Sequence, residues 1–335
     1  MTKSLRRILK YSFSFLLALI FLYLAFKGVR FADLWVSIKS ANYFWVLLLI
    51  PLNIVMNWMK AERWAYLLSP IKSRISKRIL FAGVMIGYAI NNVLPRVGEI
   101  VRPYVVGKRE GISVSSTLAT VVVERILDFM SFFFITCIVL FLYPYALDPF
   151  AGNPKLTRPL FLFGSVISLI IFVLLYFRAN EFFRFLGGIF KFMPSKYYKR
   201  INEILESFYK GFAVSKVHDK FWIILLQSFV IWGINALIMY VPFFAFDALS
   251  KPGMDFGAAV VLLVITSVAW IMPAPGAMGT YHSFLVFAMI KLYSIDLTTA
   301  LSYAIITHEI GYIVITVIGT YYYFKDHFKI RDAIG

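Results

Sequence analysis

The chain has few charged residues and almost no cysteine. Charged side chains make up 15% of its 335 residues, and Cys137 is the only cysteine. A single cysteine excludes a disulfide within the chain. The scarcity of charge, together with 61% hydrophobic and 18% aromatic residues, excludes an ordinary soluble domain. The composition is that of a protein that crosses a membrane several times.

Motifs that would supply energy or bind a metal are also missing. The sequence has no G-x-x-x-x-G-K-[S/T] motif for nucleotide phosphates and no Asp-x-Asp pair. Its four histidines are scattered along the sequence without ligand spacing, so we expect neither a metal nor another cofactor. The net charge of +17 belongs to the loops of a membrane protein, and we expect no nucleic acid as a partner.

Six apolar runs predict transmembrane helices, because most are long enough as helices to cross a hydrocarbon core of about 30 Å. No A-x-A cleavage site follows the first run before Lys27, which predicts a retained signal anchor. The runs are Ile8–Phe26, Tyr43–Met59, Phe129–Tyr143, Pro159–Phe177, Phe221–Phe246 and Thr298–Phe324.

Two further apolar segments, Ile79–Leu94 and Gly257–Met272, are short, at roughly 24 Å of helix each. Each is followed by Pro-x-x-Gly, at Pro95–Gly98 and at Pro273–Gly276. Interrupted segments at corresponding places in two halves point to a transporter binding site, whereas a kinked, packed helix is the alternative. We predict an all-α polytopic membrane protein with about six transmembrane helices and two re-entrant or broken helical segments that enter from opposite sides.

The basic residues predict the orientation. If both short segments return, 26 of the 34 Lys and Arg fall on one side, which the positive-inside rule assigns to the cytoplasm. That side holds the N-terminus, 60–78, 96–112, 178–220 and 325–335. The expected location is a bacterial cytoplasmic (inner) membrane, crossed several times, with both termini in the cytoplasm.

The chain is expected to form a single membrane domain, 1–335, with approximate halves 1–147 and 159–335. Between the halves, 178–220 holds an amphipathic segment on the cytoplasmic side. It either contacts anionic headgroups or packs under the bundle.

The stretch after the first short segment is unusually polar. Arg96 and Arg102 carry planar forks of donors suited to a phosphate, and Glu99 can orient an arginine or bind a cationic group. Pro103 predicts a short helix that begins near Arg102 and ends at about Lys108, with free N–H groups available to an anion.

The next helix, expected from Ser113–Ser116 to Tyr143, carries Glu124, Arg125 and Asp128 at membrane depth. An isolated charge there costs about 2.5 to 3.5 kcal/mol on insertion scales, so these charges are paired, hydrated or functional. The alternative to a binding site is structural pairing of Arg125 with Asp128, or of Glu124 with one of the preceding arginines.

A second intramembrane pair, His308 and Glu309, lies inside the last helix. With Pro273 and Gly276 it forms a candidate cavity of the second half. For His308 alone, a satisfied core histidine is the alternative.

The residues of these segments resemble a known family. "LPRVGEIVRPYVVGKREGISVSSTLATVVVERILD" resembles the signature of the lysylphosphatidylglycerol synthase transmembrane region family, and "MPAPGAMG" resembles its second, proline-glycine motif. The resemblance covers essentially the whole chain. Members often carry a double glycine and a downstream glutamate in the second motif, where this chain has Gly276-Ala277 and Tyr281-His282.

The resemblance implies a flippase-like helical bundle with re-entrant helices, in a stand-alone form. The larger synthases move an aminoacylated phospholipid between leaflets and carry a soluble aminoacyltransferase domain. This chain ends about ten residues after its last crossing, so we expect no aminoacyl transfer and no enzyme activity. Carried over to matching positions, the resemblance implies a substrate site formed by Arg96, Glu99, Arg102, Glu124, Arg125 and Asp128.

Three functions agree with these residues. The first is a translocase for an anionic phospholipid or a polyprenyl-linked lipid, with the headgroup phosphate held by Arg96 and Arg102. The second is a membrane transferase that uses Glu99 or Asp128 as a base. The third is an assembly or regulatory subunit of an envelope enzyme, favoured if the charged cluster is dry and self-paired.

Overall fold

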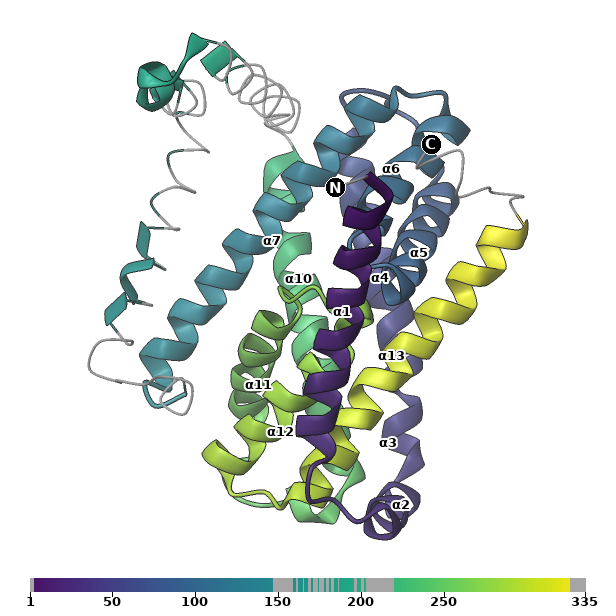
Figure 1. Cartoon of the computed structure of the whole chain (residues 1–335), viewed down its shortest axis with the longest axis vertical. Coiled ribbons are helices and arrows are strands. Elements are labelled where there is room, and N and C mark those ends of the chain that lie inside the picture. Colours follow the sequence, from purple (N-terminus) through teal and green to yellow (C-terminus); the bar gives the residue numbers. More distant parts are fainter. Residues whose placement is uncertain are drawn as a thin grey trace.

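The protein is a bundle of helices, seen in Figure 1 in a computed structural model that describes residues 3–146, part of 159–202, and 220–325. These described residues contain no β-strand. The α-helices are α1 Lys3–Phe26, α2 Phe31–Ser40, α3 Tyr43–Leu47, α4 Leu49–Leu68, α5 Lys77–Val93, α6 Gly98–Glu110, α7 Val114–Leu142, α10 Phe221–Tyr240, α11 Phe256–Ala269, α12 Thr280–Tyr293 and α13 Leu297–Lys325.

Four apolar segments are long enough to cross a membrane, and they agree with four of the predicted runs. They are Tyr43–Leu68, Val114–Leu142, Trp222–Ala245 and Leu297–Lys325. The number of crossings rises to five if α1 and α2, which meet at a bend of 83°, count as one broken span. The predicted run Pro159–Phe177 and the amphipathic segment 178–220 fall mostly outside the described residues.

The two short segments turn back where the sequence predicts a break. In Figure 1, α5 and α6 form a hairpin at one end of the bundle, whereas α11 and α12 form a hairpin at the other end. Left-handed backbone makes the turns: φ is 66° at Arg96 in the first, and 53° and 56° at Gly276 and Ala277 in the second. The all-α fold with two broken segments entering from opposite ends is confirmed.

The tips of the two hairpins meet. The guanidinium of Arg96, at the first turn, donates to the carbonyl oxygen of Ile271 beside the second turn at 2.7 Å. Asn92, near the end of α5, donates to the Thr316 hydroxyl of α13 at 2.9 Å. The last helix thus fixes the first hairpin against the second.

Glycine permits the close packing of the first hairpin. A Cβ on Gly98 would overlap the backbone oxygen of Gly87 in α5. A Cβ on Gly319 of α13 would likewise overlap the backbone oxygen of Met85. Gly98 thus allows a close approach of the α6 backbone to that of α5.

The predicted start of the α6 helix is wrong. We expected the helix to begin near Arg102, but α6 begins at Gly98 and ends at Glu110. The helix begins where Gly98 packs on α5, and Asn91 accepts a hydrogen bond from the Gly98 N–H at 2.7 Å. Arg102 is therefore a buried residue in the helix interior, and its side chain is surrounded by α4, α5 and α7.

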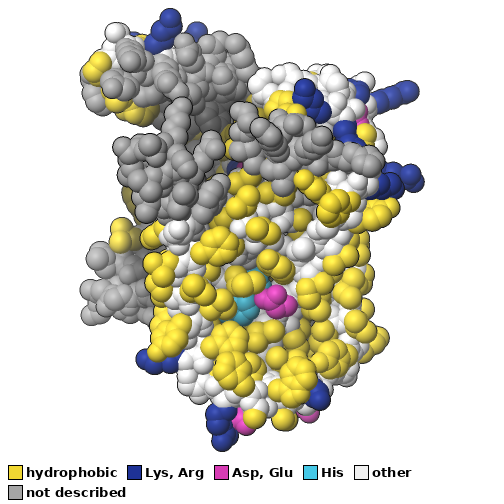
Figure 2. Space-filling view, turned by 45° about the vertical axis from the view of Figure 1, so that its right-hand side comes forward, with side chains coloured by type: hydrophobic (Ala, Val, Ile, Leu, Met, Phe, Trp, Pro, Cys, Tyr) yellow, Lys and Arg dark blue, Asp and Glu magenta, His cyan; other side chains and the backbone are white. Residues whose placement is uncertain are grey.

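The surface of the bundle separates apolar and basic regions. Figure 2 shows a face covered by hydrophobic side chains, with Lys and Arg gathered toward its two ends. Such a face suits contact with lipid chains. Histidine and acidic side chains lie together in the middle of this apolar face.

Candidate functional site

Glu124 of α7 lies at the centre of a buried charge network. Its carboxylate accepts from Arg102 of α6 at 2.9 Å, from Arg63 of α4 at 3.3 Å and from Arg125 at 3.2 Å. The side chains of Glu124 and Arg63 are fully buried, and that of Arg102 is 2% exposed. Four charged residues from three helices therefore meet in one network.

The network continues to a partly exposed rim. Asp128, 26% exposed, accepts a hydrogen bond from Arg63 at 2.6 Å and forms an ion pair with Arg125 at 3.3 Å. The guanidinium of Arg125, 36% exposed, also approaches the carboxylate of Glu99 at 3.8 Å. We use "rim" for Glu99, Arg125 and Asp128, whose charges reach the surface of the protein.

Arg63 was not predicted as a site residue, because the charge count assigned it to a cytoplasmic loop, 60–78. In the structure α4 continues to Leu68, so the assignment of this part of the loop is wrong. The helix continues because Ala61, Trp64 and Leu68 keep the apolar face at helical spacing. This apolar spacing is the sequence signal that could have predicted the longer helix and, with it, the position of Arg63.

Trp64, the next residue in α4, packs its ring against the buried guanidinium of Arg102 in α6. Its ring lies 4.6 Å from the Arg102 guanidinium carbon, and its indole N–H donates to Thr120 at 2.9 Å. A cation over a tryptophan face is stabilised by the ring quadrupole, more strongly where water is excluded.

The charges of the network balance, with three arginines facing three carboxylates. Removing one partner of a buried pair leaves an uncompensated charge, which typically costs about 3 to 5 kcal/mol. The Nε atoms of all three arginines have no hydrogen-bond partner among the described residues. These Nε atoms are themselves buried.

The predicted site residues separate into two places. Arg102, Glu124, Arg125, Asp128 and Glu99 join one network, and two of the pairings expected for a structural role, Arg125 with Asp128 and Glu124 with Arg102, are present. Arg96 is exposed and holds the Ile271 carbonyl at the second hairpin.

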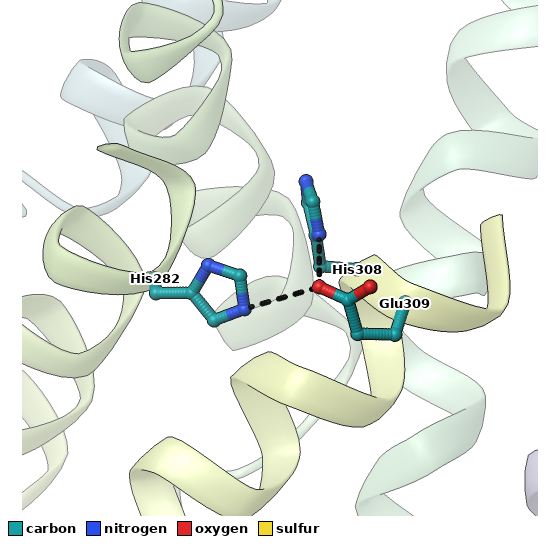
Figure 3. A group of neighbouring side chains, drawn as sticks. All are labelled: His282, His308 and Glu309. Atoms are coloured by element: carbon teal, nitrogen blue, oxygen red, sulfur yellow. Dashed lines mark hydrogen bonds and ion pairs between the residues drawn. The ribbon is translucent and has the colours of Figure 1, made fainter. Parts of the chain in front are cut away.

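A second polar cluster joins α12 and α13. His308 and Glu309 of α13 lie beside His282 of α12, and the two imidazole rings are 4.8 Å apart between centroids. Figure 3 shows both rings directed toward the same carboxylate oxygen. Glu309 Oε1 lies 2.9 Å from His308 Nδ1 and 3.7 Å from His282 Nε2.

The second hairpin turn holds this cluster in place. His308 Nε2 contacts the carbonyl oxygen of Gly276 at 2.8 Å, so the predicted partners His308 and Gly276 do meet. Pro273 lies between α11 and that turn. His282 was not predicted as a site residue, because it lies 26 positions before His308 and no local spacing connects the two.

The comparisons with known proteins agree with this architecture. The model of the lysylphosphatidylglycerol synthase TM region matches residues 11–319. A UPF0104 membrane protein of Methanothermobacter thermautotrophicus is 26% identical over 273 residues, which is 75% of this chain and 76% of that protein. One of Pyrococcus horikoshii is 26% identical over 261 residues, 71% of this chain and 74% of the relative.

A shorter match reaches a UPF0104 membrane protein of Methanocaldococcus jannaschii, 32% identical over 104 residues, 30% of this chain and 31% of that protein. All three relatives are archaeal, so the expected bacterial inner membrane stays a prediction, as does the cytoplasmic position of the termini. With a family match that spans most of the chain and apolar helices of membrane-spanning length, this multi-pass membrane protein belongs to the lysylphosphatidylglycerol synthase TM region family.

Proposed function

We propose that the protein is a translocase for a lipid with an anionic headgroup, a phospholipid or a polyprenyl-linked lipid. The observation that carries the proposal is the rim, three partly exposed charged side chains connected to a fully buried network within an apolar bundle. Exposed charges are costly in contact with lipid chains, so a rim at membrane depth implies access for water or a polar headgroup.

The geometry changes which arginines are expected to hold the phosphate. Arg102 directs two of its nitrogens at Glu124 and is almost completely buried. Arg125 has a side chain that is 36% exposed, although its Nε is buried and faces Glu99 at 3.8 Å. In our proposal Arg125 and the exposed Arg96 bind headgroup oxygens, while Arg63, Arg102 and Glu124 position the rim.

Two hairpins whose tips meet suit movement of a headgroup past the centre of the membrane. Irregular backbone at this depth is tolerated where protein or a polar cavity surrounds it. In the proposal, the headgroup passes along the rim while the acyl chains stay in lipid. The family match supports a membrane protein of this kind and names no lipid.

The test is a leaflet-exchange assay in vesicles that contain the purified protein. Phosphatidylglycerol with a fluorescent label is placed in both leaflets, and a membrane-impermeant reductant quenches the label outside. With the wild type, the reductant should quench the label from both leaflets, because lipid exchanges between them. With the folded double variant Arg96→Gln/Arg125→Gln, the label in the inner leaflet should stay unquenched. Arg30→Gln is the control, since Arg30 lies in an exposed pair with Asp33 before α2. Equal quenching with wild type and double variant would reject the headgroup role of these arginines.

The balanced charges favour a second candidate, an assembly or regulatory subunit without transport. A network that pairs three arginines with three carboxylates can be structural alone. In that case the wild type itself would not exchange lipids in the vesicle assay, and a partner protein would copurify with it from mild detergent.

A further inference from the structure

We propose that His282, His308 and Glu309 bind a first-row transition metal ion of the Zn²⁺ class. The proposal is independent of lipid transport and differs from the expectation drawn from the sequence, in which the histidines are scattered. It rests on the geometry of the three side chains that α12 and α13 bring together.

The protonation of His308 follows from its hydrogen bond. A carbonyl oxygen only accepts, so the contact of 2.8 Å with Gly276 requires a proton on His308 Nε2. In the neutral ring Nδ1 then carries a lone pair, and this lone pair faces the Glu309 carboxylate at 2.9 Å. Two acceptors at this distance need a positive charge between them, either a proton or a metal ion.

His282 decides between these two charges. Its side chain is 3% exposed, yet neither ring nitrogen has a hydrogen bond among the described residues. Nδ1 has no partner, and Nε2 lies 3.7 Å from Glu309 Oε1, too far for a hydrogen bond. A single proton shared by His308 and Glu309 leaves His282 Nε2 without a partner among the described residues, whereas a metal ion at the common point takes Nε2 as a ligand; the buried Nδ1 has no partner in either case.

The distances suit a tetrahedral ion. With bonds of about 2.0 to 2.2 Å, ligand atoms lie roughly 3.4 Å apart. The two pairs that include Glu309 Oε1 are at 2.9 and 3.7 Å, and the ligand atoms of all three residues lie within 4.8 Å of one another. A small movement of the His282 ring, which no hydrogen bond holds, would close the remaining distance.

The surroundings match those of a metal site. A ligating histidine usually donates its other N–H to a carbonyl or a carboxylate, as His308 does to Gly276. Two histidines and one carboxylate leave a fourth position open for water or an anionic oxygen. Access comes from Glu309, whose side chain is 32% exposed, and Figure 2 shows the histidine and acidic side chains at the surface.

The test measures metal in the purified full chain, with any polyhistidine tag removed. The protein is stripped with a chelator, incubated with Zn²⁺ and desalted, and its zinc content is measured by mass spectrometry. The wild type should retain one Zn²⁺ per chain, and Co²⁺ in its place should give the intense visible absorption of a tetrahedral site. Glu309→Gln and His282→Ala should bind at least tenfold more weakly.

A control separates the site from general effects. Glu62→Gln removes a carboxylate that pairs with Lys77, and this variant should keep the bound zinc. Zinc should raise the melting temperature of the wild type and leave that of the folded Glu309→Gln protein unchanged. Zinc below one ion per ten chains, or equal zinc in wild type and Glu309→Gln, would overturn the proposal in favour of a proton shared by His308 and Glu309.

Discussion

Glu124 is the residue on which the buried charge network depends. It is fully buried and contacts all three arginines, whereas Arg125 is partly exposed and also pairs with Glu99 and Asp128, which reach the surface. In our proposal the two neighbours in sequence have different tasks: Glu124 stabilises the bundle and Arg125 binds the ligand.

We predict that Glu124→Gln destabilises the protein by about 3 to 5 kcal/mol, because Arg102 loses its carboxylate partner while it stays buried. Arg125→Gln should cost roughly 1 kcal/mol or less, because its pairs are partly screened by solvent. Thermal unfolding in detergent measures both. Similar melting temperatures for the two variants would contradict this division.

Ala277 occupies a backbone conformation that glycine prefers. Its φ is 56°, next to Gly276 at 53°, and its side chain is buried. A double glycine, as the resemblance to the family implies, would suit this turn, and in this chain Ala277 adopts the left-handed backbone.

Ala277→Gly should stabilise the protein by about 1 kcal/mol, because a left-handed conformation costs about 1 to 2 kcal/mol in a residue with a Cβ. Ala274→Gly is the matched control. Ala274 has φ −92° and ψ 140°, so glycine there gains nothing and loses more chain entropy on folding. A lower melting temperature for Ala277→Gly would show that the side chain of Ala277 outweighs the strain.

At the scale of elements, the hairpin of α5 and α6 depends on contact between backbones. Gly98 packs on Gly87, and Asn91 closes the turn through the Gly98 N–H. This contact places Arg102 in the helix interior, opposite Glu124 of α7. The packing of the hairpin therefore positions the charge network.

Gly98→Ala should destabilise the protein by about 1 to 3 kcal/mol, because the added Cβ has no space beside α5. Gly233→Ala is the control. Gly233 lies in α10 with open space around its Cα, so alanine there should be neutral or stabilising. The comparison is made by thermal unfolding, and an unchanged stability of Gly98→Ala would mean that α5 and α6 separate easily.

On the scale of the whole molecule, the two hairpins decide the topology. α1 begins and α13 ends at the same end of the bundle, which is also where the hairpin of α5 and α6 opens (Figure 1). The hairpin of α11 and α12 opens at the opposite end. The charge count of the loops predicts the first end to be cytoplasmic.

Cysteine labelling with a membrane-impermeant maleimide tests this topology in closed vesicles, in a Cys137→Ser background. Single cysteines at Ser73 and Ser113, the exposed positions flanking the first hairpin, should react from the same side. Cysteines at Ser250 and Ser294, which flank the second hairpin, should react together from the other side. Opposite labelling at positions 73 and 113 would mean that α5 and α6 form one crossing.

The sequence by itself determined the properties that depend on neighbouring residues. Apolar length predicts the membrane crossings, Pro-x-x-Gly predicts the two turns, and helical spacing brings Arg125 to Asp128. Each follows from local geometry or from transfer of a single segment into lipid.

Only the tertiary structure decided which distant charges and imidazoles meet. Arg63 reaches Asp128 across 65 residues of sequence, and His282 joins His308 and Glu309 from a different helix. The start of α6 at Gly98 also depends on a partner helix. Such contacts depend on how the helices pack. Burial and charge pairing between distant segments select one arrangement of the bundle, and this arrangement cannot be predicted from the pattern of neighbouring residues.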